Sequence, residues 1–254
     1  MTTLDGATVL VTGANGGLGT ELVHQSLARG AVKVYAAART PRTWEDDRVV
    51  PLRLDVTDHE QVVAAAALAD DTTVLVNNAG IARGASLLDL PLADLDALIA
   101  TNLVGPIDLT RELAAVLRAH RGAVVNVASV LSWAAWGNGY SVSKAGLWAA
   151  TNALRLTFTP DGVQVLGAYL GYTDTPMNAG RDTTGFNTAA DVVRQILDGL
   201  EAGADEVLAD DTTRTVRAAL SGPVRALYPQ LDAGPAAGPD AAGAATVAVD
   251  GAAR

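Results

Sequence analysis

The sequence predicts an α/β protein built on one doubly wound parallel sheet of about seven strands, with helices on both faces. Short apolar runs rich in β-branched residues alternate with helical segments along most of the chain, which is typical of successive βαβ units. The runs are apolar almost throughout, as expected for strands whose two faces are both buried. A glycine-rich turn joins the first strand to the first helix. A length of 254 residues suits one large domain.

The predicted elements follow one another in a regular order. The strands are expected at residues 7–12, 32–37, 51–54, 73–76, 123–127, 163–169 and 206–208, because each is a short apolar run next to turn residues. The helices are expected at 18–29, 62–68, 92–120, 140–156 and 189–200. Asp58 is a plausible cap for the second helix, and Gly105-Pro106 predicts a bend in the third. We place the folded domain at residues 1–231, followed by a mobile Ala/Gly/Pro-rich tail at 232–254.

Composition excludes several classes of protein. The chain has no cysteine, so disulfides, thiol catalysis and Cys-ligated zinc are excluded, and the spacing of the three histidines indicates no metal site. A formal net charge of −10 argues against nucleic acids and anionic membranes as partners. No apolar run is long enough to span a bilayer, and the first residues lack the pattern of a signal peptide. We therefore expect a cytoplasmic protein.

The turn after the first predicted strand indicates a dinucleotide site. It reads T-G-x-x-x-G-x-G, from Thr12 to Gly19. Glycines let the backbone approach a phosphate closely, and the helix N-terminus that follows attracts the negative charge. A purely structural turn is the alternative. In the context of a βαβ unit, however, the turn favours a Rossmann-type fold.

The end of the second predicted strand favours NADP(H) over NAD(H). NAD-binding proteins usually place an acid there to hold the ribose 2′-hydroxyl. This chain has Ala37-Ala38-Arg39-Thr40 and no acid. A guanidinium at Arg39 would pair with a 2′-phosphate, although a solvated strand-end arginine is the alternative. NAD(H) remains possible.

Tyr140 and Lys144 have the spacing of an acid/base pair. On a helix the two side chains share a face, with Cβ atoms roughly 5–6 Å apart. An ammonium beside a phenol favours the phenolate and so lowers the proton affinity of the tyrosine. The chain has only one other lysine, Lys33. A chance pair on an exposed helix is the alternative.

Together these motifs resemble the classical short-chain dehydrogenase/reductase family. The matching features lie between about residues 5 and 230: the glycine turn, Leu54-Asp55-Val56, the run from Asn77 to Gly80, Asn102, Ser129, and Tyr140 with Lys144. The resemblance implies that Tyr140 is the acid/base and that Ser129 orients the carbonyl oxygen. It further implies that Lys144 lowers the proton affinity of the tyrosine and binds the nicotinamide ribose, while Asn102 holds a water of a proton relay.

The resemblance also implies a set of cofactor contacts. Besides Tyr140, Lys144 and Arg39 with Thr40, these are Gly13, Asn15, Gly16, Gly17, Leu18, Gly19, Asp55, Val56, Asn78, Ala79, Gly80, Gly171, Thr173 and Thr175. Two features depart from the family pattern. Ser129 and Tyr140 are 11 positions apart where about 13 is usual, so the loop between them is shortened, and Ser132 is the weaker candidate for the serine. Leu170-Gly171 replaces the usual Pro-Gly.

Aromatic residues near these motifs predict an apolar substrate pocket. We assign Trp133, Trp136, Tyr172 and Met177 to it, with Phe186 nearby; packing in the core or at a subunit interface is the alternative for each tryptophan. Residues 178–187 are polar, as in a mobile lid or an ordinary surface loop.

The predicted function is reversible interconversion of a carbonyl and an alcohol with NADP(H). The alternatives are a catalytically silent NADP(H)-binding regulator, which would tend to lose the tyrosine or the lysine, and another reaction on the same scaffold, such as epimerisation, dehydration or dehalogenation. By the resemblance, the chain would form a homotetramer or homodimer through the two long helices.

Overall fold

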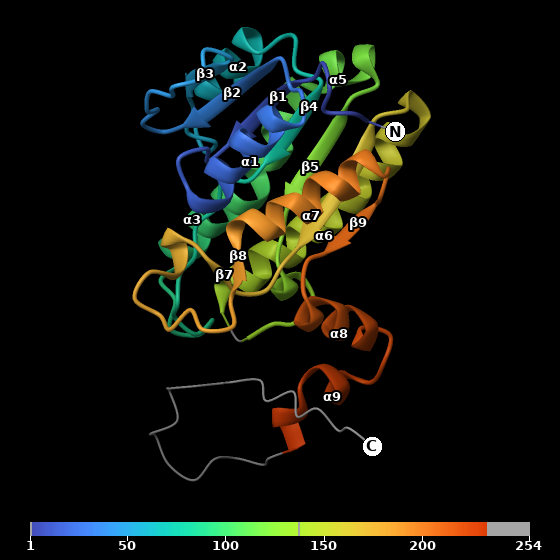
Figure 1. The fold of residues 1–254 in the computed structure, drawn as a ribbon. Helices are drawn as coiled ribbons and strands as arrows, with labels where there is room; N and C mark the ends of the chain where they lie inside the picture. Colours follow the sequence, from blue (N-terminus) through green and yellow to red (C-terminus); the bar gives the residue numbers. More distant parts are fainter. Residues whose placement is uncertain (1, 137, 233–254) are drawn as a thin grey trace.

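The computed structural model describes residues 2–136 and 138–232, and it contains the predicted parallel sheet (Figure 1). Seven strands lie in the order β3-β2-β1-β4-β5-β6-β9, all parallel. They are β1 (Thr8–Thr12), β2 (Lys33–Ala38), β3 (Val49–Arg53), β4 (Val74–Asn77), β5 (Ala123–Val127), β6 (Gln164–Tyr169) and β9 (Glu206–Leu208). The order reverses between β1 and β4, the position where open α/β sheets bind ligands.

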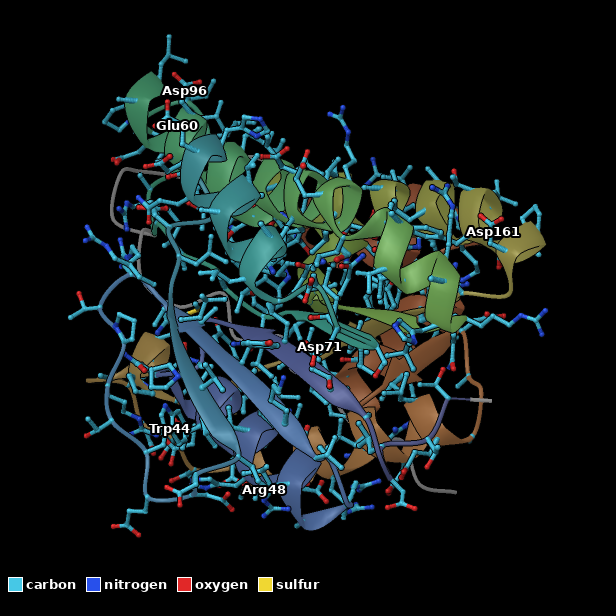
Figure 2. All side chains as sticks on the ribbon, turned by 90° about the horizontal axis from the view of Figure 1, so that it is seen from above. Trp44, Arg48, Glu60, Asp71, Asp96 and Asp161 are labelled. Atoms are coloured by element: carbon cyan, nitrogen blue, oxygen red, sulfur yellow. The ribbon has the colours of Figure 1, made fainter. Side chains whose placement is uncertain are left out.

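Helices cover both faces of this sheet, so the domain has three layers (Figure 2). One layer holds α1 (Gly17–Ala28) and α7 (Ala189–Glu201), and the other holds α2 (His59–Leu68), α4 (Gly105–Glu112), α5 (Ala114–His120) and α6 (Gly139–Phe158). The central strands are buried along their whole length. In β1, Val9 and Val11 pack on the α1–α7 side and Leu10 on the other, as the alternation of a strand requires. The predicted fold class is confirmed.

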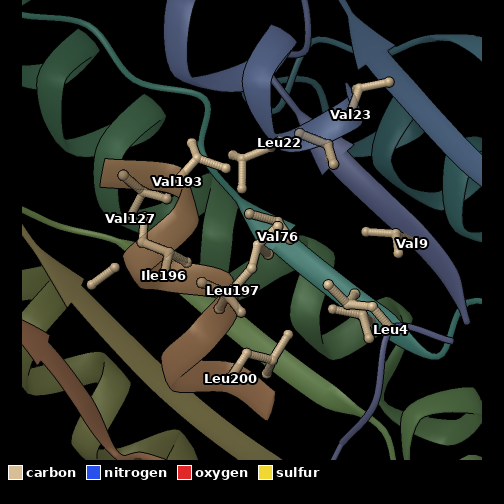
Figure 3. Close-up of a cluster of buried hydrophobic side chains, with 14 of the residues drawn as sticks. Leu4, Val9, Leu22, Val23, Val76, Val127, Val193, Ile196, Leu197 and Leu200 are labelled. Carbon is tan, nitrogen blue, oxygen red and sulfur yellow. The ribbon is translucent and has the colours of Figure 1, made fainter. Parts of the chain in front are cut away.

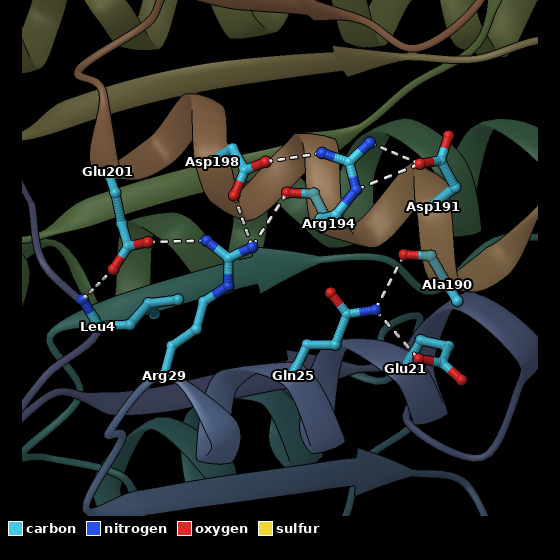
Figure 4. A network of polar contacts seen from close by, with 9 residues as sticks. All are labelled: Leu4, Glu21, Gln25, Arg29, Ala190, Asp191, Arg194, Asp198 and Glu201. Atoms are coloured by element: carbon cyan, nitrogen blue, oxygen red, sulfur yellow. Dashed lines mark hydrogen bonds and ion pairs between the residues drawn. The ribbon is translucent and has the colours of Figure 1, made fainter.

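The α1–α7 layer is held mainly by apolar packing. Leu22, Val193, Ile196 and Leu200 are fully buried between the helices and the sheet (Figure 3), and burial of each such side chain contributes roughly 1.5–3 kcal/mol. Ion pairs join the outer edges of the two helices (Figure 4). The guanidinium of Arg29 lies 2.7 Å from both Asp198 and Glu201. These partly exposed pairs orient the helices and add little stability.

The long helix predicted at 92–120 is divided into several parts. α3 (Leu92–Ile99) leads into a π-helical turn, η1 (Ala100–Val104), before α4 and α5. The helix therefore departs from regularity one turn before the predicted bend at Gly105-Pro106. Gly105 itself allows close packing, because a Cβ there would lie 2.8 Å from the carbonyl oxygen of Val56. π-Turns often occur at functional sites, and this one carries Asn102.

The C-terminal part contains helices that the sequence did not predict. After β9 the chain forms α8 (Asp211–Ala219), α9 (Val224–Leu227) and a 3-10 turn, η5 (Pro229–Asp232), beyond the end of the sheet (Figure 1). Five shorter elements lie earlier: the 3-10 turns η2 (Val130–Ser132), η3 (Thr159–Asp161) and η4 (Pro176–Asn178), and the paired strands β7 (Thr173–Asp174) and β8 (Asn187–Thr188). Most of the predicted tail, residues 233–254, lies outside the described residues. Within residues 2–136 and 138–232, none of the helices has the length and apolarity to cross a membrane.

Candidate active site

A cavity of about 740 Å³ lies at the carboxyl edge of the sheet. Because all strands are parallel, the segments that leave β1, β4, β5 and β6 meet there. The walls include most of the predicted site residues: Gly13, Gly16, Gly17, Leu18, Gly19, Asn78, Ala79, Gly80, Ser129, Trp136, Tyr140, Lys144, Gly171, Tyr172, Thr173, Thr175 and Met177. Residues from distant parts of the chain thus surround one space.

The glycine turn has the geometry of a phosphate cradle. Gly13 has a φ of 65°, which favours glycine. A Cβ at Gly19 would lie 2.1 Å from the carbonyl oxygen of Gly13, and one at Gly17 would lie 2.9 Å from the Thr175 methyl. Gly16 precedes α1 and makes no side-chain cap with any described residue, and the first turn of α1 has no acid. The turn therefore offers a bare helix N-terminus to an anion, and the residues present fit a dinucleotide.

Thr12 fixes this turn to the end of β4, a role that the sequence pattern does not predict. Its hydroxyl accepts hydrogen bonds from the backbone N–H groups of Asn78 at 3.0 Å and Ala79 at 2.9 Å. The side-chain amide of Asn78 in turn donates to the Thr12 carbonyl at 2.8 Å. The T-G pair at the strand end could have indicated this bond, since a buried hydroxyl needs partners.

Tyr140 and Ser129 place two hydroxyl groups on the cavity wall. Ser129 follows β5, and Tyr140 stands in the first turn of α6, whose cap is the side chain of Asn138. The Ser129 hydroxyl lies close enough to the phenol of Tyr140 to lower its pKa. The alternative serine, Ser132, is buried and lies outside the cavity lining. The structure thus pairs Tyr140 with Ser129 despite the shortened loop.

Lys144 lies beneath Tyr140, one turn further along α6. It is 5% exposed, and its Nζ donates to the Val127 carbonyl at 2.9 Å and lies 5.7 Å from the centroid of the Tyr140 ring. Asn102 is fully buried nearby. A Cβ at Gly80 would approach both Asn102 Oδ1, at 3.3 Å, and Lys144 Nζ, at 3.9 Å. Gly80 therefore lets the amide and the ammonium lie side by side.

Asn102 links three elements around the lysine. Its Oδ1 accepts from the Ile81 N–H, and its Nδ2 donates to the Ile81 carbonyl, both at 2.9 Å. Nδ2 also donates to the Ser143 hydroxyl at 3.0 Å. These bonds hold the segment after β4 against the π-turn and α6, which positions Gly80 and Lys144.

Burial sets the proton affinities of the pair. It raises the pKa of Tyr140 to about 12, against the lowering effect of Ser129. It also lowers the pKa of Lys144 to about 8. Both shifts follow from the cost of holding a charge away from water. In this structure burial outweighs any lowering of the Tyr140 pKa by Lys144, so the pKa of the phenol is above its ordinary value, and the pKa of Lys144 is the one that is shifted toward neutral pH.

Aromatic side chains from three segments form one wall near these groups. The ring centroids of Trp136 and Tyr172 are 5.9 Å apart, and Tyr172 stacks on Phe186 at 5.0 Å with an interplanar angle of 10°. Trp136, Tyr172 and the half-exposed Met177 line the cavity. Phe186 lines a smaller cavity of about 240 Å³ next to it.

Trp133 does not join this wall, which corrects its assignment to the substrate pocket. It is 6% exposed and packs on Tyr169, with ring centroids 4.2 Å apart, and on Trp148 at 6.5 Å. Ala128 and Leu147 complete this core cluster. The shortened loop turns through η2, so Trp133 points into the protein while Trp136, three residues later, lies at the cavity.

Replacing Trp133 by Phe should therefore reduce stability and not substrate affinity. Phe removes part of a buried ring system and leaves space beside Tyr169, which should cost about 1–2 kcal/mol. Urea unfolding measures this cost. In steady-state kinetics, we expect KM for the carbonyl substrate to remain within a factor of two. A large rise in KM without destabilisation would show that Trp133 contacts the substrate.

A family model described as short chain dehydrogenase matches residues 7–184. The chain belongs to this family. Among curated relatives, the short-chain dehydrogenase PC-15 of Penicillium crustosum is 37% identical over 180 residues, which are 66% of this chain and 66% of that protein. Human retinol dehydrogenase 16 is 36% identical over 185 residues, 67% of this chain and 58% of that protein. The match thus spans less than two thirds of the length of each of these two relatives.

A solved short chain dehydrogenase of Burkholderia cenocepacia J2315, in complex with NADP, is similar over nearly its whole length. It superposes with a TM-score of 0.85 at 33% identity and covers 91% of this chain and 99% of that chain.

Five of the predicted cofactor contacts lie outside the lining of the cavity. Arg39 is exposed directly after β2, and the carbonyl of Thr40 accepts from Asn15 Nδ2 at 2.8 Å. The Asp55 carboxylate accepts from the N–H and hydroxyl of Thr57. Val56 is 8% exposed and packs against Gly105. Asn15 belongs to the glycine turn itself, whereas the other four residues follow β2 and β3.

Other residues of this short chain dehydrogenase line the cavity and were not predicted. Arg83 follows the run that ends at Gly80, Asn138 caps α6, and Asn178 and Arg181 lie in the segment after β7. The sequence did mark residues 178–187 as a possible lid, but no motif distinguished an arginine there from a solvated one.

One further group could hold a metal by distance alone. His59, Asp108 and Glu112 come together on the outer surface of α2 and α4. His59 Nδ1 lies 2.8 Å from Asp108 Oδ2, and this contact raises the pKa of the histidine. The exposed ion pair accounts for the arrangement.

Proposed function

We propose that this short chain dehydrogenase is an NADP(H)-dependent oxidoreductase that interconverts a ketone or aldehyde and the corresponding alcohol. The observation that supports it best is the shared cavity. Tyr140, Ser129 and Lys144 line the same space as the glycine turn, so a dinucleotide held at the turn can reach the hydroxyl pair. An apolar aromatic wall beside that pair suits the body of an organic substrate.

The roles of the residues follow from their chemistry. Bound NADPH supplies the hydride for the carbonyl carbon. Ser129 donates a hydrogen bond to the carbonyl oxygen, where negative charge grows during reduction. Tyr140 transfers its hydroxyl proton to that oxygen, and oxidation runs the same transfer in reverse.

Lys144 would make this proton transfer reversible. With its pKa of about 8, the side chain can take up or release a proton near neutral pH. An ammonium at this position also stabilises the phenolate that forms when Tyr140 gives up its proton. Asn102 holds the surrounding segments in place and, by the family resemblance, would also hold a water of the relay.

The preference for NADP(H) rests on the end of β2. The solved relative from Burkholderia was crystallised with NADP. In this chain Arg39 is exposed just after Ala38, and the bond from Asn15 to Thr40 brings this strand end against the glycine turn. A guanidinium there can bind a 2′-phosphate through charge-assisted hydrogen bonds.

Replacing Arg39 by Ala should therefore shift cofactor preference. We expect KM for NADPH to rise about tenfold or more, since a hydrogen bond to a charged group contributes about 1.5–3 kcal/mol, while KM for NADH changes little. Parallel kinetics with both cofactors measure the effect. A wild-type preference for NADH that persists in Arg39→Ala would contradict the assignment.

The direct test of the function is NADPH oxidation by the purified protein with a panel of aliphatic, aromatic and cyclic ketones and aldehydes, with NADH in parallel. Turnover with NADPH would support the reductase. Clear NADPH binding without turnover on any carbonyl would favour the catalytically silent regulator; the presence of both Tyr140 and Lys144 in the cavity speaks against it.

We also propose a single domain over residues 1–231, a cytoplasmic location and a homotetramer or homodimer. Gel filtration with light scattering tests the assembly.

A further inference from the structure

The charge of the cavity wall differs from that of the rest of the molecule. The chain has 28 Asp and Glu residues against 18 Lys and Arg. Among the described residues that line the 740 Å³ cavity, however, Arg83, Lys144 and Arg181 carry positive charge and none is an acid. A protein with a formal net charge of −10 repels anions at long range, so this local reversal favours an anion inside the cavity.

A bound dinucleotide accounts for only part of this reversal. Its phosphates are expected at the glycine turn and the N-terminus of α1. Arg181 contacts a different part of the cavity. Its Nη1 donates to the Tyr172 hydroxyl at 3.1 Å, and its guanidinium lies 5.3 Å from the centroid of the Tyr172 ring. Tyr172 belongs to the aromatic wall with Trp136 and Phe186. The cation is therefore held on the substrate side.

The charge of Arg181 has no carboxylate partner within the described part of the chain. Asp182, its neighbour, accepts from the N–H and hydroxyl of Thr184. Arg83, by contrast, has a carboxylate partner, because its Nε lies 3.4 Å from Asp94. The tyrosine satisfies only one of the five N–H donors of the Arg181 guanidinium. The remaining donors are available for an anion.

The carboxylate in the adjoining cavity is already engaged. Asp210 lines the smaller cavity of about 240 Å³ behind the aromatic wall. It accepts from the Gly171 N–H at 2.6 Å, from Asn187 Nδ2 at 2.9 Å, and from the N–H and hydroxyl of Thr213, each at 2.8 Å. These bonds hold its pKa below the ordinary value although burial opposes the shift. The Asp210 carboxylate is therefore fixed by these bonds and holds the backbone of Gly171 in place.

We propose that the substrate is a carbonyl compound with an apolar part about the size of an aromatic ring. It also carries an anionic group, either a carboxylate or a phosphate, that binds Arg181. The body packs against Trp136 and Tyr172 while the carbonyl reaches Ser129 and Tyr140. This inference rests on the proposed function for the reaction. The charge preference itself is a property of binding and can be measured separately.

The test compares nearly isosteric ketones that differ in charge. Wild-type protein saturated with NADPH is assayed with 4-acetylbenzoate, 4-acetylbenzamide and 4-acetylphenyl phosphate. We expect kcat/KM for the benzoate to exceed that for the benzamide about tenfold or more, as for other hydrogen bonds to charged groups. The phosphate distinguishes the two anions: a further gain identifies a phosphate substrate, and a loss identifies a carboxylate.

Variants assign the preference to Arg181. In Arg181→Gln the benzoate-to-benzamide ratio should fall about tenfold or more, mainly through KM, with little change for the benzamide. Arg111→Gln is the matched control, because Arg111 is exposed on α4 and lies outside the cavity lining. It loses the same charge and should keep the wild-type ratio. Raising the salt concentration should weaken the benzoate preference and leave the benzamide unchanged.

Equilibrium binding separates this inference from the proposed reaction. Calorimetric titration of both ketones into protein with NADP⁺ should show the same Arg181-dependent preference even if neither ketone is reduced. Equal affinities for the benzoate and the benzamide in wild type would overturn the proposal. So would an Arg181→Gln variant that weakens NADPH binding as much as benzoate binding, since Arg181 would then serve the cofactor.

Discussion

Tyr140→Phe is expected to lower kcat about 10²–10⁴-fold while NADPH binding is retained. The substitution removes a single oxygen atom, and with it the proton that reduction needs at the carbonyl oxygen. The half-buried ring keeps its place in the first turn of α6, so the cavity should keep its shape. Steady-state kinetics measure the loss, and fluorescence titration with NADPH shows that cofactor binding persists.

Tyr169→Phe is the matched control for this substitution. Tyr169 is also buried, but its hydroxyl has no hydrogen-bond partner among the described residues, and it lies outside the cavity lining. Removal of this oxygen should leave kcat unchanged. A Tyr140→Phe protein with kcat within tenfold of wild type would show that another group delivers the proton, and our assignment of the acid/base would fail.

The sequence could predict those site residues that come directly after a strand. In a parallel sheet every strand delivers its following residues to the same edge. Once the strands at 7–12, 73–76 and 123–127 are recognised, Gly13, Asn78 and Ser129 must lie near one another. The helical spacing of Tyr140 and Lys144 places both on one face, and the cavity contains them all.

Sequence could not decide features that depend on packing between distant segments. Trp133 and Trp136 are equally apolar and only three residues apart, so the turn of η2 alone determines that the first packs on Tyr169 and the second lines the cavity. The pKa of Tyr140 is another such feature. The spacing to Lys144 predicts a lowered value, whereas burial of the phenol, which spacing does not reveal, raises it.

The C-terminal helices illustrate the same limit. α8 is rich in threonine and arginine and has little apolar surface of its own, so no hydrophobic pattern predicts it. It forms because Asp210 caps it at Thr213. The hydroxyl of Tyr228, just after α9, accepts from the Ala135 N–H at 2.8 Å. The segment after β9 thus holds two parts of the cavity wall in place: Asp210 binds Gly171, and Tyr228 binds the shortened loop at Ala135.

Lys144→Met should also abolish most turnover, and it should alter stability in a pH-dependent way. Met fills a similar volume but cannot hold or release a proton, so we expect kcat to fall about 10²–10⁴-fold. The stability effect arises from burial. The pKa of Lys144 is lowered to about 8 in the folded chain and is about 10.4 in an unfolded one.

The direction of the pH effect follows from the number of protons that the folded and unfolded chains bind. Between about pH 8 and 10.4 the unfolded chain holds a proton on Lys144 that the folded chain has lost, so the free energy of unfolding rises with pH through this window. Below pH 8 the folded chain bears the cost of a buried charge. Relative to wild type, Lys144→Met should therefore lose on the order of 2 kcal/mol of stability as pH rises from 7.5 to 10. Urea unfolding at the two pH values measures this change.

Lys33, the only other lysine in the sequence, provides the control. It lies on β2, and its Nζ contacts Asp71 at 2.7 Å, an interaction that raises its pKa. Its contribution to stability is therefore present below its ordinary pKa and is lost only at higher pH. Lys33→Met should keep full activity and show no relative loss of stability between pH 7.5 and 10. If both variants responded to pH alike, the effect would belong to lysine in general, and the burial of Lys144 would not explain its proton chemistry.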